Sequence, residues 1–174
     1  MKHEIRARFD AHTVTVYQAY GHAIADAALG AQRFVAPFSY GRMTWVKPSF
    51  LWMMERCGWA TKAQQERVLA VSVRREAFDE LVRSAVPTSV SDSHAPVRVQ
   101  WDPERSLRGG KLEVRSLQLG IGRELIRRYA LDWTTAIEDV TPLVRRIDAL
   151  RREGRWDHAA RLLPAERVYA LTGT

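Results

Sequence analysis

The chain has 174 residues, of which 46% are hydrophobic and 27% charged, as in an ordinary globular protein, and its net charge is +7. No apolar run approaches the roughly 20 residues of a membrane-spanning helix, and the start MKHEIRARFD lacks the apolar stretch of a secretory signal. Cys57 is the only cysteine, which excludes an internal disulfide, and no His/Cys cluster has zinc-ligand spacing. We expect a cytoplasmic protein with no metal, no membrane partner, and an anionic ligand or nucleic acid as partner.

The residue pattern alternates between short strands and amphipathic helices. Strands are predicted where β-branched and aromatic residues are frequent, over 13–20, 42–46, 66–74, 97–101 and 111–122. Helices are predicted where the pattern favours them, over 21–30, 49–57, 76–85, 123–133, 140–150 and 156–163. Residues 102–110 are expected to form a turn-rich connection. The proline-bounded segment Val86–Pro96 is expected to be a mobile loop, and whether it closes over a ligand stays open.

Strands that occur singly or in pairs, without a strict strand–helix–strand rhythm, predict an α+β fold with a mixed, largely antiparallel sheet flanked by helices. We expect one domain over residues 1–174, with a core over about 6–140 and a helical C-terminal extension over about 141–174. The apolar phase of the last strand changes at Arg115–Ser116, which indicates either a β-bulge or a break in the strand at that point. Thr141 is expected to cap the helix that follows it.

The densest stretch is RMTWVKPSFLWMM, residues 42–54, and it divides at its proline. From Phe50 onwards it is apolar nearly all round, which predicts a buried helix. Before that point, Arg42 and Lys47 flank a short strand, and Ser49 stands at the helix start, where free backbone N–H groups favour an anion. The pattern is compatible with a phosphate-bearing ligand and also with simple cation–π contacts to the neighbouring tryptophan.

Other polar residues occupy strand positions where apolar ones are usual. Gln18 continues an apolar strand face, so it either bonds to backbone or faces a cleft. Arg115 and Gln118 lie in a strand that is expected to cross the sheet, where polar side chains need partners. Cys57 is expected to be buried in its helix, and His22 is expected to lie on the surface.

The segments VYQAY, RMTWVKPSFLWMM, VRVQWDPER and RSLQLGIG resemble the family catalogued as domain of unknown function 4291, which occurs in bacteria and fungi. The resemblance runs from about Arg6 to Thr141. The family name conveys no activity, so the expectation about function depends on the residues themselves and on a second resemblance.

The order of TVTVYQAY, RMTWVKPSFLWMM and KLEVRSLQLG is similar to that of ADP-ribosyltransferase-like proteins. In that fold a first strand holds the nicotinamide ribose of NAD, a second strand runs into a helix, and a late strand carries Glu or Gln. The resemblance implies NAD as a substrate, with catalytic residues Gln18, Glu113 and Gln118 and cofactor-binding residues Arg42, Thr44, Trp45, Lys47 and Ser49. It implies acceptor-binding arginines as well, namely Arg6, Arg98 and Arg115.

Within this resemblance, Arg42 and Lys47 are expected to bind the pyrophosphate and Trp45 to stack on nicotinamide. Two departures narrow the expectation, because Gln18 replaces the usual His or Arg and no E-x-E or Q-x-E pair is present. Transfer to protein acceptors is therefore disfavoured. The positive charge favours a nucleic-acid or other phosphorylated acceptor.

The alternative is a non-enzymatic RNA-binding module, in which exposed aromatic side chains beside arginines stack on bases. The burial of Trp45, Trp52 and Trp101 separates the two hypotheses, because a buried ring cannot stack on a base. A phosphoesterase or nuclease that needs no metal is a third hypothesis, which the lack of paired histidines disfavours. The sequence leaves the oligomeric state open.

Overall fold

The computed structural model describes residues 2–91 and 94–172, and the fold is α+β, as predicted. Its strands are β1 (Arg6–Ala7), β2 (Thr13–Tyr20), β3 (Thr44–Val46), β4 (Arg67–Arg74), β5 (Val86–Pro87), β6 (Val97–Arg105), β7 (Lys111–Ile121), β8 (Thr134–Asp139) and β9 (Arg167–Val168). Its helices are α1 (His22–Ala31), α2 (Phe50–Cys57), α3 (Arg75–Ser84), α4 (Arg123–Arg128), the π-helical segment η1 (Tyr129–Trp133), α5 (Thr141–Arg152) and α6 (Trp156–Leu162). No helix in the described ranges is long and apolar enough to cross a membrane.

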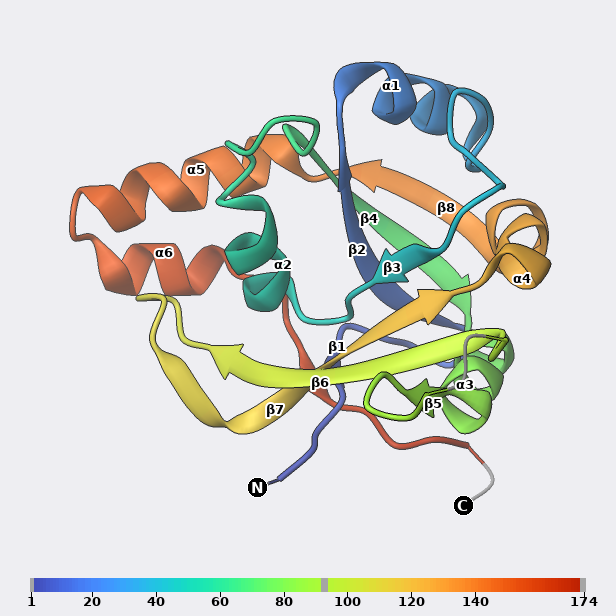
Figure 1. The fold of residues 1–174 in the computed structure, drawn as a ribbon. Coiled ribbons are helices and arrows are strands. Elements are labelled where there is room, and N and C mark those ends of the chain that lie inside the picture. The colour runs from blue at the N-terminus through green and yellow to red at the C-terminus, as the bar shows by residue number, and fades with distance from the viewer. Residues whose placement is uncertain (1, 92–93, 173–174) are drawn as a thin grey trace.

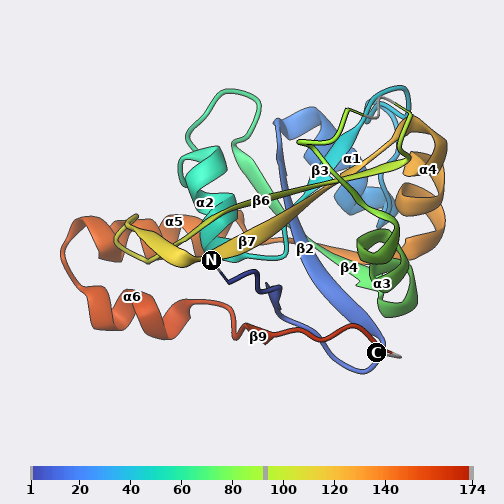
Figure 2. The ribbon, with the colours of Figure 1, turned by 60° about the horizontal axis from the view of Figure 1, so that its bottom comes forward.

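Two sheets form the centre of the molecule. One has the strand order β2-β4-β8 and is antiparallel, and the other has the order β3-β7-β6-β5, with a short parallel pair between β5 and β6. The strands β1 and β9 pair separately, which joins segments from the two ends of the chain. The helices α5 and α6 lie side by side at one end of the molecule, and α3 and α4 lie at the opposite end (Figure 1, Figure 2).

Buried apolar side chains form two clusters, and β4 contributes to both. Its residues Leu69, Val71 and Val73 belong to the larger cluster, which the facing strands and the helices α1, α3 and α4 complete. Val68 and Ala70 point the other way, into the smaller cluster with α2 and α5. A middle strand that is covered on both faces explains the nearly continuous apolar run VLAVSV. The helix α2 is buried, as the sequence predicts, and Cys57 on it is fully buried.

The structure corrects the expected elements in two places. β6 continues to Arg105, whereas the sequence predicts a turn after Trp101, and Glu104 on this strand is buried. Pro103 is tolerated because β5 pairs only with the first residues of β6, so near the proline the second edge of β6 has no partner strand among the described residues. The polar segment TTAIED at 134–139 has too weak an alternation to predict a strand, yet it forms β8 against β4.

Two local expectations are also wrong. The irregular pairing of β6 with β7 falls between Pro103 and Arg105, opposite the first residues of β7, and not at Arg115–Ser116. Thr141 does not cap α5, because its hydroxyl oxygen accepts the backbone N–H of Val68 at 2.9 Å instead. In both cases the local geometry depends on a partner from a distant part of the chain, β6 for β7 and Val68 for Thr141, and the local sequence pattern contains no information about that partner.

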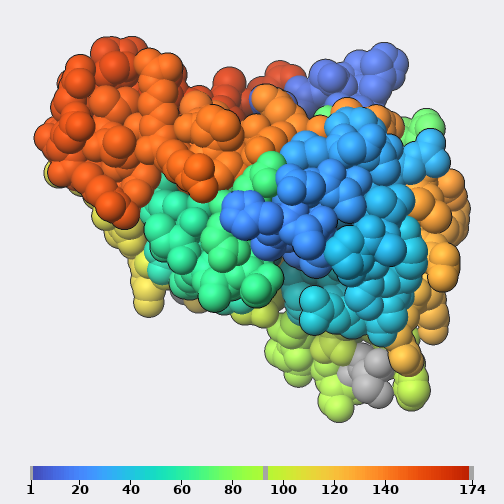
Figure 3. Space-filling model, turned by 90° about the horizontal axis from the view of Figure 1, so that it is seen from above, coloured from blue at the N-terminus to red at the C-terminus, as the bar shows by residue number. Residues whose placement is uncertain are grey.

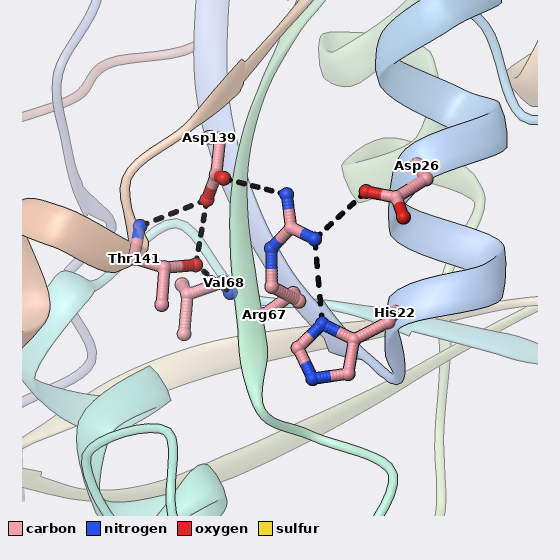
Figure 4. Close-up of polar contacts among 6 residues, drawn as sticks. All are labelled: His22, Asp26, Arg67, Val68, Asp139 and Thr141. Atoms are coloured by element: carbon pink, nitrogen blue, oxygen red, sulfur yellow. Dashed lines mark hydrogen bonds and ion pairs between the residues drawn. The ribbon is translucent and has the colours of Figure 1, made fainter.

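Arg67, the first residue of β4, joins three elements through its guanidinium group (Figure 4). It donates to Asp139 at the end of β8 at 2.7 Å and to Asp26 on α1 at 2.8 Å, and it lies 3.4 Å from His22, which is exposed as expected. Burial by itself raises the pKa of Asp139, but hydrogen bonds from Thr141 and Arg67 outweigh it and hold the pKa below its usual value. This cluster ties α1 and the start of α5 to the first sheet.

Replacing Asp139 with asparagine is expected to lower the free energy of unfolding by about 1 kcal/mol at neutral pH, because the Arg67 pair is partly exposed. The loss should disappear in acid. Folding lowers the pKa of Asp139 below its usual value of 3.8. The ionised carboxylate therefore stabilises the fold fully at pH values above 3.8, and this stabilisation is lost as the pH falls through the pKa of the folded state. Urea unfolding at neutral and acidic pH measures both effects. Asp26→Asn is the matched control, because Asp26 is 68% exposed, and an equal loss there would contradict the account.

Candidate functional site

The two sheets are joined at Tyr17 and Lys47, and a cavity opens beside this pair. Tyr17 of β2 and Lys47, directly after β3, exchange two backbone hydrogen bonds of 2.7 and 3.3 Å. Beyond them β2 continues against β4 and β3 against β7, so the two strands part. The cavity of about 250 Å³ lies in this wedge. The segments around it meet at the surface in Figure 3, α1 and the chain after it in blue and cyan beside the chain around α2 in green.

The cavity gathers side chains from the end of β2, from α1, from the segment that leads into β3, and from α2 and the loop after it. They are Gln18, Ala19, Tyr20, Ile24, Phe38, Ser39, Arg42, Met43, Thr44, Trp45, Lys47, Met53 and Gln65. Five of the residues predicted to form a site therefore lie together, namely Gln18, Arg42, Thr44, Trp45 and Lys47. The lining contains two cations and no carboxylate, so its electrostatic potential favours an anion.

Lys47 is the unusual member of the lining, because its side chain is buried and only 7% of the residue is exposed. Within the described ranges its ammonium group makes no hydrogen bond or ion pair. Burial lowers the pKa of Lys47 to about 8, and the nearby charge of Arg56 acts in the same direction, while Cys57 and Asp102 act against it. A buried cation without a partner is unfavourable. An anion in the cavity would supply that partner.

Arg42 contributes the second positive charge from the rim, where it is exposed. Its charge acts on Tyr20. Burial raises the pKa of Tyr20 to about 12, although a hydrogen bond with Thr44 and the charge of Arg42 both oppose the rise. The phenol of Tyr20 therefore stays protonated at neutral pH and serves the cavity as a hydrogen-bonding group.

Trp45 forms an apolar wall of the cavity and is half-buried. It pairs with Gly120 across β3 and β7, and its ring lies over that glycine. A Cβ atom at Gly120 would come within 2.7 Å of the Met43 sulfur and 2.9 Å of the Trp45 ring. The glycine of QLGIG therefore makes room for the tryptophan that lines the cavity.

Gln18 is held by two tyrosines. Tyr129 of η1 donates its hydroxyl to Gln18 Oε1 at 2.5 Å, and Gln18 Nε2 donates to the Tyr20 hydroxyl at 2.7 Å. Burial raises the pKa of Tyr129 well above its usual value, so this hydroxyl keeps its proton and can donate it to the amide oxygen of Gln18. No sequence signal links Tyr129 to Gln18, because the two residues lie 111 positions apart in the chain.

The start of α2, where the sequence predicts an anion, is occupied by groups of the protein itself. Ser49 is buried, and its hydroxyl accepts the N–H of Trp52 at 3.1 Å and donates to Glu104 at 2.9 Å. The carboxyl group of Glu166 accepts the N–H of Phe50 at 3.1 Å, and burial raises the pKa of this group to about 8. Ser49 therefore caps the helix and does not line the cavity.

The other residues suggested by the sequence lie away from the cavity. Gln118 is buried and donates to Asp102 at 3.0 Å. Arg98 and Arg115 donate to backbone carbonyl groups of neighbouring segments. Glu113 is exposed near the start of β7, and Arg6 is exposed and pairs with Glu4. The lining of the cavity thus excludes Arg6, Arg98, Glu113, Arg115 and Gln118.

A second cavity of about 260 Å³ adjoins the first. It is lined by Arg42, Met43, the segment 94–96 and the segment 122–124, so Arg42 and Met43 face both cavities. Residues 92–93, part of the loop that the sequence predicts to be mobile, lie outside the described residues. In the part of the chain that the structure describes, no group of three or more His, Cys, Asp or Glu side chains is arranged to hold a metal ion.

These features define an α+β protein with a cationic cavity at the junction of its two sheets. The chain belongs to the family described as domain of unknown function (DUF4291), which matches residues 4–169 and so includes both sheets and the cavity. The family assignment confirms the first resemblance seen in the sequence. No curated protein matches the chain.

Proposed function

We propose that the protein binds NAD in the cavity beside Lys47 and transfers ADP-ribose to a nucleic-acid or other phosphorylated acceptor. The observation that carries this proposal is the lining of the cavity, where two cations and no carboxylate lie beside the ring of Trp45. NAD presents matching groups, namely a pyrophosphate with two negative charges and an aromatic nicotinamide. Arginine and lysine are the side chains that usually bind phosphate oxygens.

The position of Arg42 between two cavities supports a dinucleotide in particular. NAD consists of two nucleosides joined by a pyrophosphate. Arg42 lines both cavities. If it binds the pyrophosphate, one nucleoside of NAD can enter the first cavity and the other nucleoside can enter the second. In this arrangement the nicotinamide half enters the cavity with Lys47, and Trp45 offers its ring to the positively charged nicotinamide.

The reaction breaks the bond between C1 of the ribose and the nicotinamide nitrogen. Neutral nicotinamide leaves with the electron pair of this bond, positive charge develops on the ribose, and a nucleophilic oxygen of the acceptor forms the new bond to C1. The pyrophosphate neutralises Arg42 and Lys47, which removes their repulsion of this charge. Gln18, with its amide fixed by Tyr129, is the residue that holds the ribose. The proposal assigns no role to Glu113 or Gln118, because neither lines the cavity.

Arg42→Ala is expected to weaken NAD binding by about tenfold or more, since it removes a charge-assisted contact to the pyrophosphate. Arg42 is exposed, so the variant should unfold at an unchanged temperature. Isothermal titration calorimetry measures the affinity. Arg33→Ala is the matched control, because Arg33 is an exposed arginine of the same segment that lines neither cavity. Unchanged affinity in Arg42→Ala would overturn the proposal.

Nucleic-acid binding without catalysis is the second candidate. Trp52 is buried and Trp101 is covered by His3, with ring centroids 4.3 Å apart, so these rings are not platforms for bases. A different surface favours this candidate, a shallow groove at α6 where Arg108 lies 4.4 Å from the ring of Trp156. Binding of RNA that weakens steeply with salt and persists in Arg42→Ala would support this candidate.

A further inference from the structure

Lys47 differs from every other lysine of the chain. The sequence contains four lysines, and the other three, Lys2, Lys62 and Lys111, are exposed. Lys47 is 7% exposed and lines a cavity large enough for a small molecule. Its backbone is fixed by the hydrogen bonds to Tyr17 that join the two sheets, so the side chain starts from a fixed position beside the cavity.

The surroundings of Lys47 make its neutral, nucleophilic form more accessible than that of an ordinary lysine, although the charged form still predominates at neutral pH. The charged and titratable groups around it are Arg42 at the rim, Tyr20 on β2, Arg56 and Cys57 on α2, and Asp102 on β6. Burial and Arg56 lower the pKa of Lys47 to about 8, so at that pH about half of the amine is unprotonated. A lysine that is desolvated beside another cation is the arrangement in which lysine acts as a nucleophile toward carbonyl groups.

We propose that Lys47 forms an imine with a phosphorylated aldehyde or ketone that enters the cavity, with Arg42 holding the phosphate. The neutral amine adds to the carbonyl carbon and a C–N bond forms. The carbonyl oxygen then leaves as water with the two protons that the nitrogen gives up, so no oxidant or reductant is needed. This activity uses the same cavity as the proposed NAD site but does not depend on NAD chemistry.

Pyridoxal 5′-phosphate, a phosphorylated aldehyde, is a suitable probe. The wild-type protein is incubated at pH 8 with less than one equivalent of the probe and reduced with borohydride, and the labelled peptides are identified by mass spectrometry. Because the neutral fraction of an ordinary lysine at that pH is roughly 100-fold smaller, Lys47 should carry at least about tenfold more label than Lys62. Inorganic pyrophosphate should protect Lys47 and leave the label on the exposed lysines unchanged.

Two variants separate the amine from its charge. Lys47→Arg keeps the positive charge but has no primary amine, so the main label should disappear, whereas Lys62→Arg should keep it. Arg42→Ala should reduce labelling of Lys47 about tenfold, because the phosphate loses its partner. Label on Lys47 no greater than on Lys62, or label that pyrophosphate does not displace, would overturn the inference.

This outcome is distinguishable from the outcome for NAD. Labelling of Lys47 in a protein that does not bind NAD keeps the imine activity and overturns the proposed function. Binding of NAD together with an unlabelled Lys47 does the reverse.

Discussion

Replacing Lys47 with methionine is expected to stabilise the fold and at the same time to remove the affinity of the cavity for anions. Methionine fills a similar volume without a charge. The lowering of the Lys47 pKa from 10.5 to about 8 corresponds to a destabilisation of about 3 kcal/mol by the buried charge. We expect Lys47→Met to recover about 1–3 kcal/mol of this, in line with other replacements of buried charges by apolar residues.

The pH dependence of this difference has a definite sign. The folded protein releases the Lys47 proton near pH 8, while the unfolded chain holds it until about 10.5, so the unfolded state binds more protons between these values. The wild-type protein should therefore gain stability relative to Lys47→Met as pH rises through this window. Urea unfolding of both proteins at pH 7 and pH 9 measures the change. Both proteins also contain Glu166 and the tyrosines whose pKa values are shifted. The contributions of these groups to the pH dependence cancel when the free energies of unfolding of the two proteins are subtracted.

Lys62→Met is the matched control, because Lys62 is exposed and its replacement leaves the cavity intact. It should change neither the stability by more than about 0.5 kcal/mol nor the binding of NAD. A Lys47→Met protein that is less stable than wild type, or that binds NAD with unchanged affinity, would contradict the account. The first result would show that Lys47 has a stabilising partner, and the second that the ligand lies elsewhere.

Replacing Tyr129 with phenylalanine is the second change with a large expected effect. It removes one oxygen and leaves the buried amide oxygen of Gln18 without its donor. An unsatisfied buried acceptor lowers stability by about 1–3 kcal/mol. NAD affinity should fall as well, because the amide of Gln18 is no longer fixed beside the cavity. Urea unfolding and calorimetry measure the two effects on the same samples.

A double-mutant cycle tests whether the effect passes through Gln18. In Gln18→Met the Tyr129 hydroxyl loses its acceptor, so the single variants are both destabilised, but the double variant removes donor and acceptor together. It should therefore be more stable than the sum of the single losses predicts, by about 1 kcal/mol or more. Additive losses would show that Tyr129 and Gln18 act independently. Tyr40→Phe, which removes a hydroxyl bonded to the carbonyl of Phe34 outside this pair, serves as the control.

Local sequence patterns were sufficient for most elements. The β-branched run at 13–20 forms β2, and the apolar stretch after Ser49 forms the buried helix α2. These elements carry their own signal because each buries an apolar face. The polar segment 134–139 carries none, and it becomes β8 because β4 offers hydrogen-bonding partners from a distant part of the chain.

The candidate site shows the same division. Gln18, Arg42, Trp45 and Lys47 stand out in the sequence because they are polar or aromatic residues near strand ends, and the structure brings them to one cavity. Ser49 has the right type and position for an anion site, but Glu104 and Glu166 approach from segments that the local pattern cannot place. The role of Tyr129 could not be predicted either, because its partner Gln18 lies on another element of the fold.

The structure of the protein with NAD bound tests the central claim most directly. The account predicts nicotinamide in the cavity beside Trp45 and Lys47 and the pyrophosphate within hydrogen-bonding distance of Arg42. Crystals soaked in NAD at a concentration well above its dissociation constant would show this arrangement. An empty cavity under those conditions, or NAD bound at a surface that does not include Arg42 and Lys47, would contradict the account.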